Sequence, residues 1–129
     1  MAKLTEGQAD LFKGKNLATV ATIRRDGSPH LTPVWIDWDG EDVLFNTAEG
    51  RAKPRHIRRN PVVGVEVIDG HDPYRWVSVT GPAEIVEEGA VEHIQELSRR
   101  YTGRDFDLRA DQKRLIVRVK PERVTARGV

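Results

Sequence analysis

The residues best suited to chemistry form a basic run in the middle of the chain. Five cations and no acidic residue occupy positions 51–59: Arg51, Lys53, Arg55, Arg58 and Arg59. The first two follow Gly50 at the expected start of a helix, where free N–H groups and the helix dipole favour an anion. An arginine fork matches phosphate oxygens, and a lysine adds a compact charge. The run is therefore a candidate phosphate site, although such runs are more often solvated helix faces.

Aromatic residues supply a second candidate for ligand contact. Five of the eight aromatic side chains fall on expected strands or beside them: Trp35, Trp38, Phe45, Tyr74 and Trp76. Together they can build a flat apolar slot. Pro33 interrupts the hydrogen-bond ladder beside Trp35, which leaves backbone groups free for a ligand. The alternative interpretation is that these rings belong to the barrel core.

The sequence lacks the motifs of enzymes that work without a cofactor. The four histidines show no HExxH spacing, and neither a GxSxG motif, a P-loop nor a Rossmann fingerprint is found. Cysteine is absent, which excludes thiolate catalysis and cysteine-based metal sites. We therefore name no metal ligand and no catalytic side chain, and expect a bound cofactor to carry any difficult chemistry.

Chain length and net charge limit the kind of domain that positions these residues. The 129 residues contain 21 Lys and Arg against 20 Asp and Glu, a net charge of +1. Without the five cations of the basic run the remainder is 16 − 20 = −4. This balance argues against nucleic acid as a partner. One domain over residues 1–129 is expected, and the lack of a signal peptide or a long apolar run favours a cytoplasmic protein without membrane contact.

Local patterns predict a mainly β chain with three helices. Thr5 and Gln8 form a capping box for a first helix, the basic run forms a second, and apolar residues spaced three and four apart predict a third over 91–101. Six strands are expected at 17–24, 30–38, 43–47, 62–68, 75–86 and 115–119, followed by an extended tail. Pro33 places its strand at an edge or a bulge, and Gly81-Pro82 predicts a bend. The result is an antiparallel barrel or curled sheet of α+β type.

Three stretches, in order, resemble a known family. They are ATIRRDGSPHLTPVWIDWDGEDVLFNT, GRAKPRHIRRNP and RWVSVTGPAEI, at residues 21–47, 50–61 and 75–85. They are similar to the flavin and deazaflavin oxidoreductases of the pyridoxamine 5′-phosphate oxidase-like split barrel, in the subgroup that uses coenzyme F420. The resemblance covers roughly residues 10 to 125. It implies a six-stranded antiparallel split β-barrel of the FMN-binding type with short flanking helices, and a homodimer with two cofactor sites at its interface.

The resemblance also implies roles for individual residues. Arg51 and Lys53 are expected to hold the cofactor phosphate. Four residues of the second strand line the ring: Thr32, Pro33, Val34 and Trp35. Three residues of the next strand continue the pocket: Phe45, Asn46 and Thr47. Three residues of the opposite subunit cover it: Tyr74, Arg75 and Trp76. The chain departs from the family pattern at Pro54 and His56, which affects how the helix presents Arg55 and Arg58.

The activity implied by the resemblance is hydride transfer between coenzyme F420 and a small organic acceptor with an activated double bond or a similar group. The coenzyme carries a phosphodiester and an acidic tail, and Arg55, Arg58 or Arg59 could meet the tail carboxylates. FMN, the alternative cofactor, would leave several of these cations without a partner. A non-enzymatic carrier of F420 or flavin needs the same binding residues and is a second hypothesis. Nucleic-acid binding through the basic helix, with Trp76 stacking on a base, is a third and is disfavoured by the acidic remainder.

Overall fold

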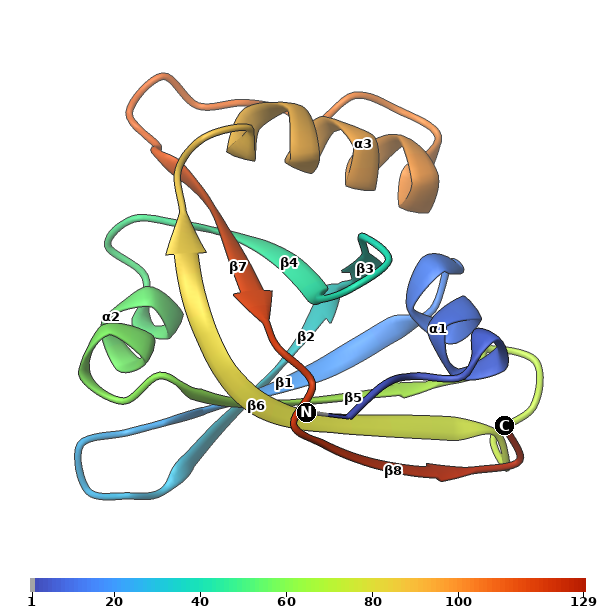
Figure 1. Ribbon diagram of the computed structural model, residues 1–129. Coiled ribbons are helices and arrows are strands. Elements are labelled where there is room, and N and C mark those ends of the chain that lie inside the picture. Colours follow the sequence, from blue (N-terminus) through green and yellow to red (C-terminus); the bar gives the residue numbers. More distant parts are fainter. Residues whose placement is uncertain (1) are drawn as a thin grey trace.

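The computed structural model describes residues 2–129 and shows a curled antiparallel sheet with three helices around it (Figure 1). The helices are α1 (Glu6–Lys13), α2 (Ala52–Arg59) and α3 (Ala90–Thr102). The strands are β1 (Leu17–Ile23), β2 (Pro29–Trp35), β3 (Asp37–Trp38), β4 (Val43–Ala48), β5 (Val62–Ile68), β6 (Trp76–Val86), β7 (Arg114–Val119) and β8 (Arg123–Arg127). Within residues 2–129, no helix has the length and apolar character needed to cross a membrane.

Strand β6 joins the two halves of the fold. The strand order is β2-β1-β5-β6-β7-β4-β3, and β8 also pairs with β6. The first part of β6 pairs with β5 and β8, whereas its last residues, from Ala83 to Val86, pair with β7. Figure 1 shows β6 curving strongly between these two sets of partners. The bend predicted at Gly81-Pro82 is therefore confirmed.

Glycine is required at the bend because another segment of backbone crosses there. A Cβ built on Gly81 would overlap the carbonyl oxygen of Lys120, which lies in the connection between β7 and β8. That connection also donates backbone N–H groups to β6, from Lys120 to Pro82 at 2.9 Å and from Glu122 to Thr80 at 3.0 Å. The absence of a side chain at position 81 thus lets the two halves approach each other.

The expected second strand is divided, which corrects the prediction of one strand over 30–38. The backbone N–H and carbonyl of Ile36, which lies between β2 and β3, form hydrogen bonds with side chains of α3 and not with a neighbouring strand. Its N–H donates to the Tyr101 hydroxyl at 3.1 Å, and its carbonyl accepts from Arg100 at 3.1 Å. The tail is also a strand, β8, because residues 123–127 pair with β6. The described chain therefore has eight strands instead of the six predicted.

Two local predictions are confirmed. Strand β2 pairs only with β1, with Pro33 opposite Thr19, so the proline lies on an edge strand as expected. The Thr5 hydroxyl accepts from the Gln8 N–H at 3.2 Å and the Gln8 side chain accepts from the Thr5 N–H at 3.0 Å, which completes the capping box of α1. The core lies inside the curled sheet and contains mainly valines with Phe12 and Phe45.

Candidate functional site

A cavity of about 360 Å³ lies where the two ends of the strand order approach each other. This volume falls in the range typical of small-molecule sites. One wall comes from β1 and the edge strand β2, and the other comes from β4, β7, α3 and the start of α2. The lining residues are Leu17, Pro33, Val34, Trp35, Asn46, Thr47, Arg51, Lys53, Ile94, Leu97, Phe106 and Arg114. Seven of them are among the residues that the sequence singled out.

Three cations line this cavity, and none of them forms an ion pair with an acidic residue within residues 2–129. Arg51 is the exposed N-cap residue of α2, and its side chain caps no backbone group there. Lys53 is half-buried and donates to the Thr32 hydroxyl at 3.0 Å. Burial lowers the pKa of Lys53, and the nearby positive charge of Arg51 lowers it further. A bound anion would offset this repulsion.

Arg114 is the third cation, and sequence reasoning missed it. Only 6% of its surface is exposed, and burial followed by repulsion from Arg51 lowers its pKa. Its Nε donates to Asn46 Oδ1 at 2.9 Å, and its guanidinium carbon lies 5.1 Å from the centre of the Phe106 ring. The sequence does hold a signal, because Arg114 directly precedes the apolar run of β7 and so enters the sheet with it.

A chain of buried polar side chains supports Asn46 from behind. The Asn46 amide donates to the Ala90 carbonyl at 2.8 Å and lies 3.2 Å from His93 Nδ1. Because Asn46 Oδ1 accepts from Arg114 on its other side, the amide nitrogen must face His93, whose Nδ1 then accepts and whose Nε2 carries the proton. His93 Nε2 is 3.1 Å from Asp37 Oδ2.

Asp37 ends this chain at α3. Burial alone would raise the pKa of its carboxyl, but hydrogen bonds from His93 and Arg100 outweigh burial and hold the pKa below its usual value. Arg100 donates to Asp37 Oδ1 at 2.8 Å. The chain fixes the rotamer of Asn46, and through Asn46 it fixes the position of the Arg114 guanidinium in the cavity wall.

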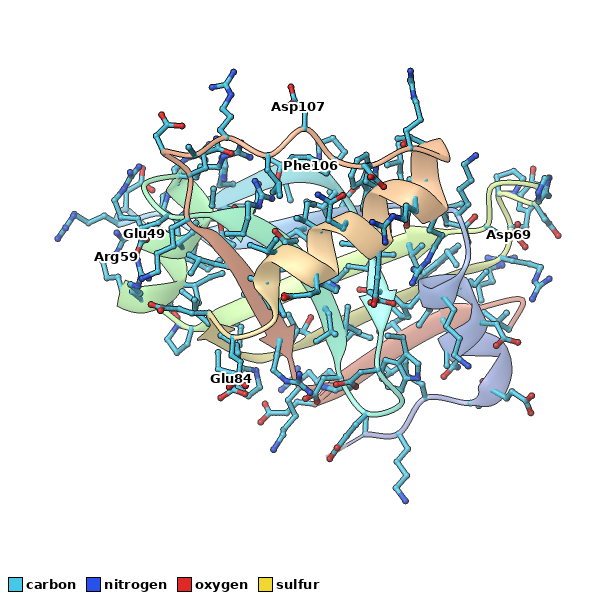
Figure 2. All side chains as sticks on the ribbon, turned by 90° about the horizontal axis from the view of Figure 1, so that it is seen from above. Glu49, Arg59, Asp69, Glu84, Phe106 and Asp107 are labelled. Atoms are coloured by element: carbon cyan, nitrogen blue, oxygen red, sulfur yellow. The ribbon has the colours of Figure 1, made fainter. Side chains whose placement is uncertain are left out.

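Another part of the cavity wall is apolar and aromatic. The Trp35 ring stacks on Tyr101 with centroids 5.5 Å apart and planes inclined by 14°, and Phe106 meets its edge at 6.4 Å. Figure 2 shows Phe106 on the inner side of the segment between α3 and β7, while Asp107 points away from the body. Ile94 and Leu97 of α3 complete this wall. The cavity wall therefore offers aromatic faces to a planar ring and positive charges to an anion.

Thr47 provides an independent indication that a polar ligand fits here. It lines the cavity with 1% of its surface exposed, and its Oγ1 is buried without a hydrogen-bond partner within residues 2–129. Buried hydroxyl groups are almost always paired in folded proteins. A ligand oxygen or ring nitrogen in the cavity would supply the missing partner.

The chain is also clearly similar to known proteins. A family model described as pyridoxamine 5′-phosphate oxidase matches residues 4–128. The chain belongs to the pyridoxamine 5′-phosphate oxidase family. This assignment confirms the predicted split-barrel fold, with the strand count corrected above.

The chain is similar to two solved structures and to one further named relative. A structure of an F420 reductase is 35% identical, with a TM-score of 0.84 over 95% of this chain and 98% of that one. A conserved hypothetical protein from Mycobacterium tuberculosis is 31% identical, with a TM-score of 0.75 over 97% of this chain and 85% of that one. The F420H(2)-dependent biliverdin reductase of Mycobacterium tuberculosis (strain CDC 1551 / Oshkosh) is 26% identical over 124 residues, covering 95% of this chain and 87% of the relative.

Three of the residues expected from the family pattern lie outside the cavity lining. Thr32 contacts the site only through its hydrogen bond with Lys53. Phe45 is fully buried in the core, because its side chain points into the curled sheet. Arg58 is on the solvent side of α2, where it makes two hydrogen bonds to the Glu49 carboxylate at 2.6 and 2.9 Å. The structure therefore does not bring Phe45 or Arg58 to the cavity.

The three residues expected from an opposite subunit lie far along the sheet in their own chain. Tyr74 is 75% exposed, Arg75 pairs with Asp69 at 3.4 Å, and Trp76 begins β6 opposite Arg127. None of Tyr74, Arg75 and Trp76 lines the cavity of the same chain. Their contribution to the cavity of a partner stays a prediction.

Proposed function

We propose that the protein is a reductase that uses the deazaflavin coenzyme F420 and acts on a small organic acceptor. The observation that carries the proposal is a single cavity whose wall combines aromatic side chains with three cations that lack an acidic partner among residues 2–129. Relatives named as F420-dependent reductases, at 26% and 35% identity, support the choice of coenzyme. FMN remains the alternative cofactor to be tested.

The residues present fit the coenzyme in charge and shape. Arg51 and Lys53 would bind its phosphate, and the Thr47 hydroxyl would gain a partner. Backbone groups on the free edge of β2 would border the ring, since β2 pairs with β1 alone. When bound in its reduced form, the coenzyme supplies a hydride, and a proton from solvent or a side chain completes the reduction of one double bond.

The chain's own residues then assist the acceptor. Trp35, Phe106 and Leu97 form an apolar wall that would shield one side of a bound ligand from water and so strengthen electrostatic interactions there. The positive charge of Arg114 favours negative charge that develops on an acceptor as it receives a hydride. These features favour an electron-poor, conjugated acceptor. Biliverdin is a suitable first compound to test, because one relative is a biliverdin reductase.

We propose that the working form is a homodimer. Leu17 and Leu31 are each 62% exposed, and Val62 and Ile68 add apolar surface on β5. Leu31 lies opposite Ala21, which lies opposite Gly64, so these positions share the outer face of the sheet. Several exposed apolar side chains on one face of a sheet are typical of protein interfaces. Leu17 also lines the cavity, so a partner docked on this face would reach the site.

Sedimentation of the wild type and of Leu31→Glu tests the dimer. We expect a dimer for the wild type and a monomer with unchanged circular dichroism for the variant. A monomeric wild type at all concentrations would overturn this part of the proposal.

Fluorescence titration with purified coenzyme F420 tests the cofactor assignment. We expect saturable binding by the wild type and a loss of about a hundredfold or more in affinity for Arg51→Ala with Lys53→Ala, since each charge-assisted hydrogen bond contributes about 1.5–3 kcal/mol. The matched control is Lys3→Ala with Arg123→Ala, which removes two exposed cations outside the cavity and should bind normally. Tight binding of FMN with none of F420 would replace the proposed coenzyme by the alternative.

A further inference from the structure

A second basic cavity, of about 440 Å³, lies beside α2 and shares no lining residue with the first. It is bounded by the turn between β1 and β2, by β2 itself and by α2. Its lining residues are Arg24, Arg25, His30, Ala52, Arg55, His56 and Arg59. Figure 2 shows Arg59 at the end of the molecule where α2 lies. Four arginines and two histidines therefore surround one hollow.

The four arginines of this second cavity lack acidic partners among residues 2–129. Two of them are held in place by backbone carbonyls, because Arg24 donates to Pro29 at 2.9 Å and Arg59 donates to Ile23 at 3.0 Å. Asp26 is the acidic residue of the adjoining turn, but its carboxylate accepts from the Ser28 hydroxyl at 2.6 Å. The fold thus positions the cations, and none of them forms an ion pair within residues 2–129, although the hydrogen bonds from Ser28 and, after them, the charge of Arg24 lower the pKa of the Asp26 carboxyl.

The inner wall of the cavity is a pair of histidines. His56 is buried, and its Nδ1 lies 2.8 Å from the hydroxyl of the fully buried Thr22. The His30 ring meets the His56 ring edge to face, with centroids 5.2 Å apart. His30 Nδ1 is buried without a hydrogen-bond partner within the described residues. A histidine nitrogen in this condition is suited to gaining a proton once a negative charge arrives nearby.

The charged groups that face the two rings are all positive. Burial lowers the pKa of His30, and Arg24 and Lys53 lower it further. Burial likewise lowers the pKa of His56, followed by His30 and then by Arg59, Arg55 and Arg24. Both rings are therefore neutral near pH 7 in the free protein. An anion in the cavity would reverse these influences and favour the charged rings.

We propose that this second cavity binds a small oxyanion with two or more negative charges, and that binding is accompanied by protonation of the His30 and His56 pair. The guanidinium groups of Arg55 and Arg59 would bind the anion from α2, and Arg24 would bind it from the turn. Phosphate and dicarboxylate ligands share this chemistry. Arg55 and Arg59 are also candidates for contact with the acidic tail of the coenzyme, so the site is tested in protein to which no coenzyme has been added.

Titration with inorganic sulfate, followed by the NMR signals of the histidine rings, tests the site in the full chain. Sulfate keeps its double charge across the range used, so any pH dependence belongs to the protein. We expect His30 and His56 to shift while the exposed His71 does not. We also expect affinity at about pH 5.5 to exceed affinity at about pH 8 by about tenfold or more, the effect of a pKa change of about one unit. Inorganic phosphate and succinate, titrated in parallel, then distinguish the two ligand types.

Three variants separate this site from the first cavity. Arg55→Gln with Arg59→Gln should weaken sulfate binding by about tenfold or more, since two charge-assisted contacts are lost. His56→Asn, which keeps a partner for Thr22, should reduce the pH dependence. Arg114→Gln alters the first cavity, which shares no lining residue with the second, and should bind sulfate normally. The proposal is overturned if His30 and His56 do not respond to sulfate, if affinity is the same at both pH values, or if only the last variant loses binding.

Discussion

The crossing at Gly81 predicts a large and specific loss of stability for Gly81→Ala. The added Cβ would overlap the carbonyl oxygen of Lys120, which belongs to the backbone and cannot rotate away as a side chain would. Overpacking of a well-packed site costs about 1–3 kcal/mol, and a backbone obstruction belongs at the upper end. A loss of about 3 kcal/mol would lower the melting temperature by roughly 10 °C in a domain of this size.

Gly64→Ala is the matched control in the neighbouring strand. A Cβ on Gly64 would meet Ala21 Cβ at 3.7 Å and the Thr80 hydroxyl at 3.9 Å, which are ordinary contacts. Replacing this glycine should change the free energy of unfolding by less than about 1 kcal/mol, because the smaller entropy of the unfolded chain favours alanine. Equilibrium unfolding in urea measures both variants. Equal stabilities for Gly81→Ala and Gly64→Ala would refute the close crossing as the reason for glycine at position 81.

Three further predictions concern the polar chain and the aromatic wall. Asn46→Leu keeps the number of side-chain heavy atoms but leaves Arg114 and His93 without their hydrogen-bond partner. It should lower the free energy of unfolding in urea by about 2–4 kcal/mol and weaken coenzyme binding. Unchanged affinity for the coenzyme would show that Arg114 needs no support from Asn46. Tyr101→Phe loses the hydroxyl that links α3 to two backbone segments and should cost about 1–3 kcal/mol, while the retained ring stacking leaves Trp35 fluorescence nearly unchanged. The pKa of Asp37 is lowered by folding, so its contribution to stability is present above about pH 4 and is lost as the pH falls through its folded pKa. Asp37→Asn should therefore be less stable than the wild type near pH 7 and should lose less stability between about pH 5 and pH 2. If urea unfolding of the variant shows the same acid dependence as the wild type, the contribution of Asp37 to acid stability is contradicted.

Much of the fold could be predicted because local signals agree with the tertiary structure. The Thr5 capping box, the edge position of Pro33 and the bend at Gly81 each follow from the chemistry of one or two residues. The break at Ile36 could not be predicted, because it depends on Arg100 and Tyr101, more than sixty residues away. Strand β8 was missed for a similar reason, since its pairing with β6 is set by the fold and not by its own sequence.

Site residues could be predicted where their role follows from the local sequence around them. Arg51 and Lys53 lie at a helix start that the sequence indicates, and both line the cavity. Arg114 was missed because its importance arises from burial beside Arg51, a cation of another element, whereas the local pattern shows only a charge at the start of an apolar strand. Phe45 was assigned to the pocket together with its neighbours, but its ring lies in the core, whereas Asn46 and Thr47 line the cavity.

Single-turnover oxidation of reduced coenzyme F420 tests the proposed reductase most directly. The protein is mixed with one equivalent of the reduced coenzyme, and a panel of conjugated acceptors that includes biliverdin is added while the coenzyme absorbance is followed. We expect at least one acceptor to oxidise the coenzyme faster on the protein than in free solution, with a rate that saturates with acceptor and falls in Arg51→Ala with Lys53→Ala. Tight coenzyme binding with no acceleration by any acceptor would contradict a reductase and favour a carrier.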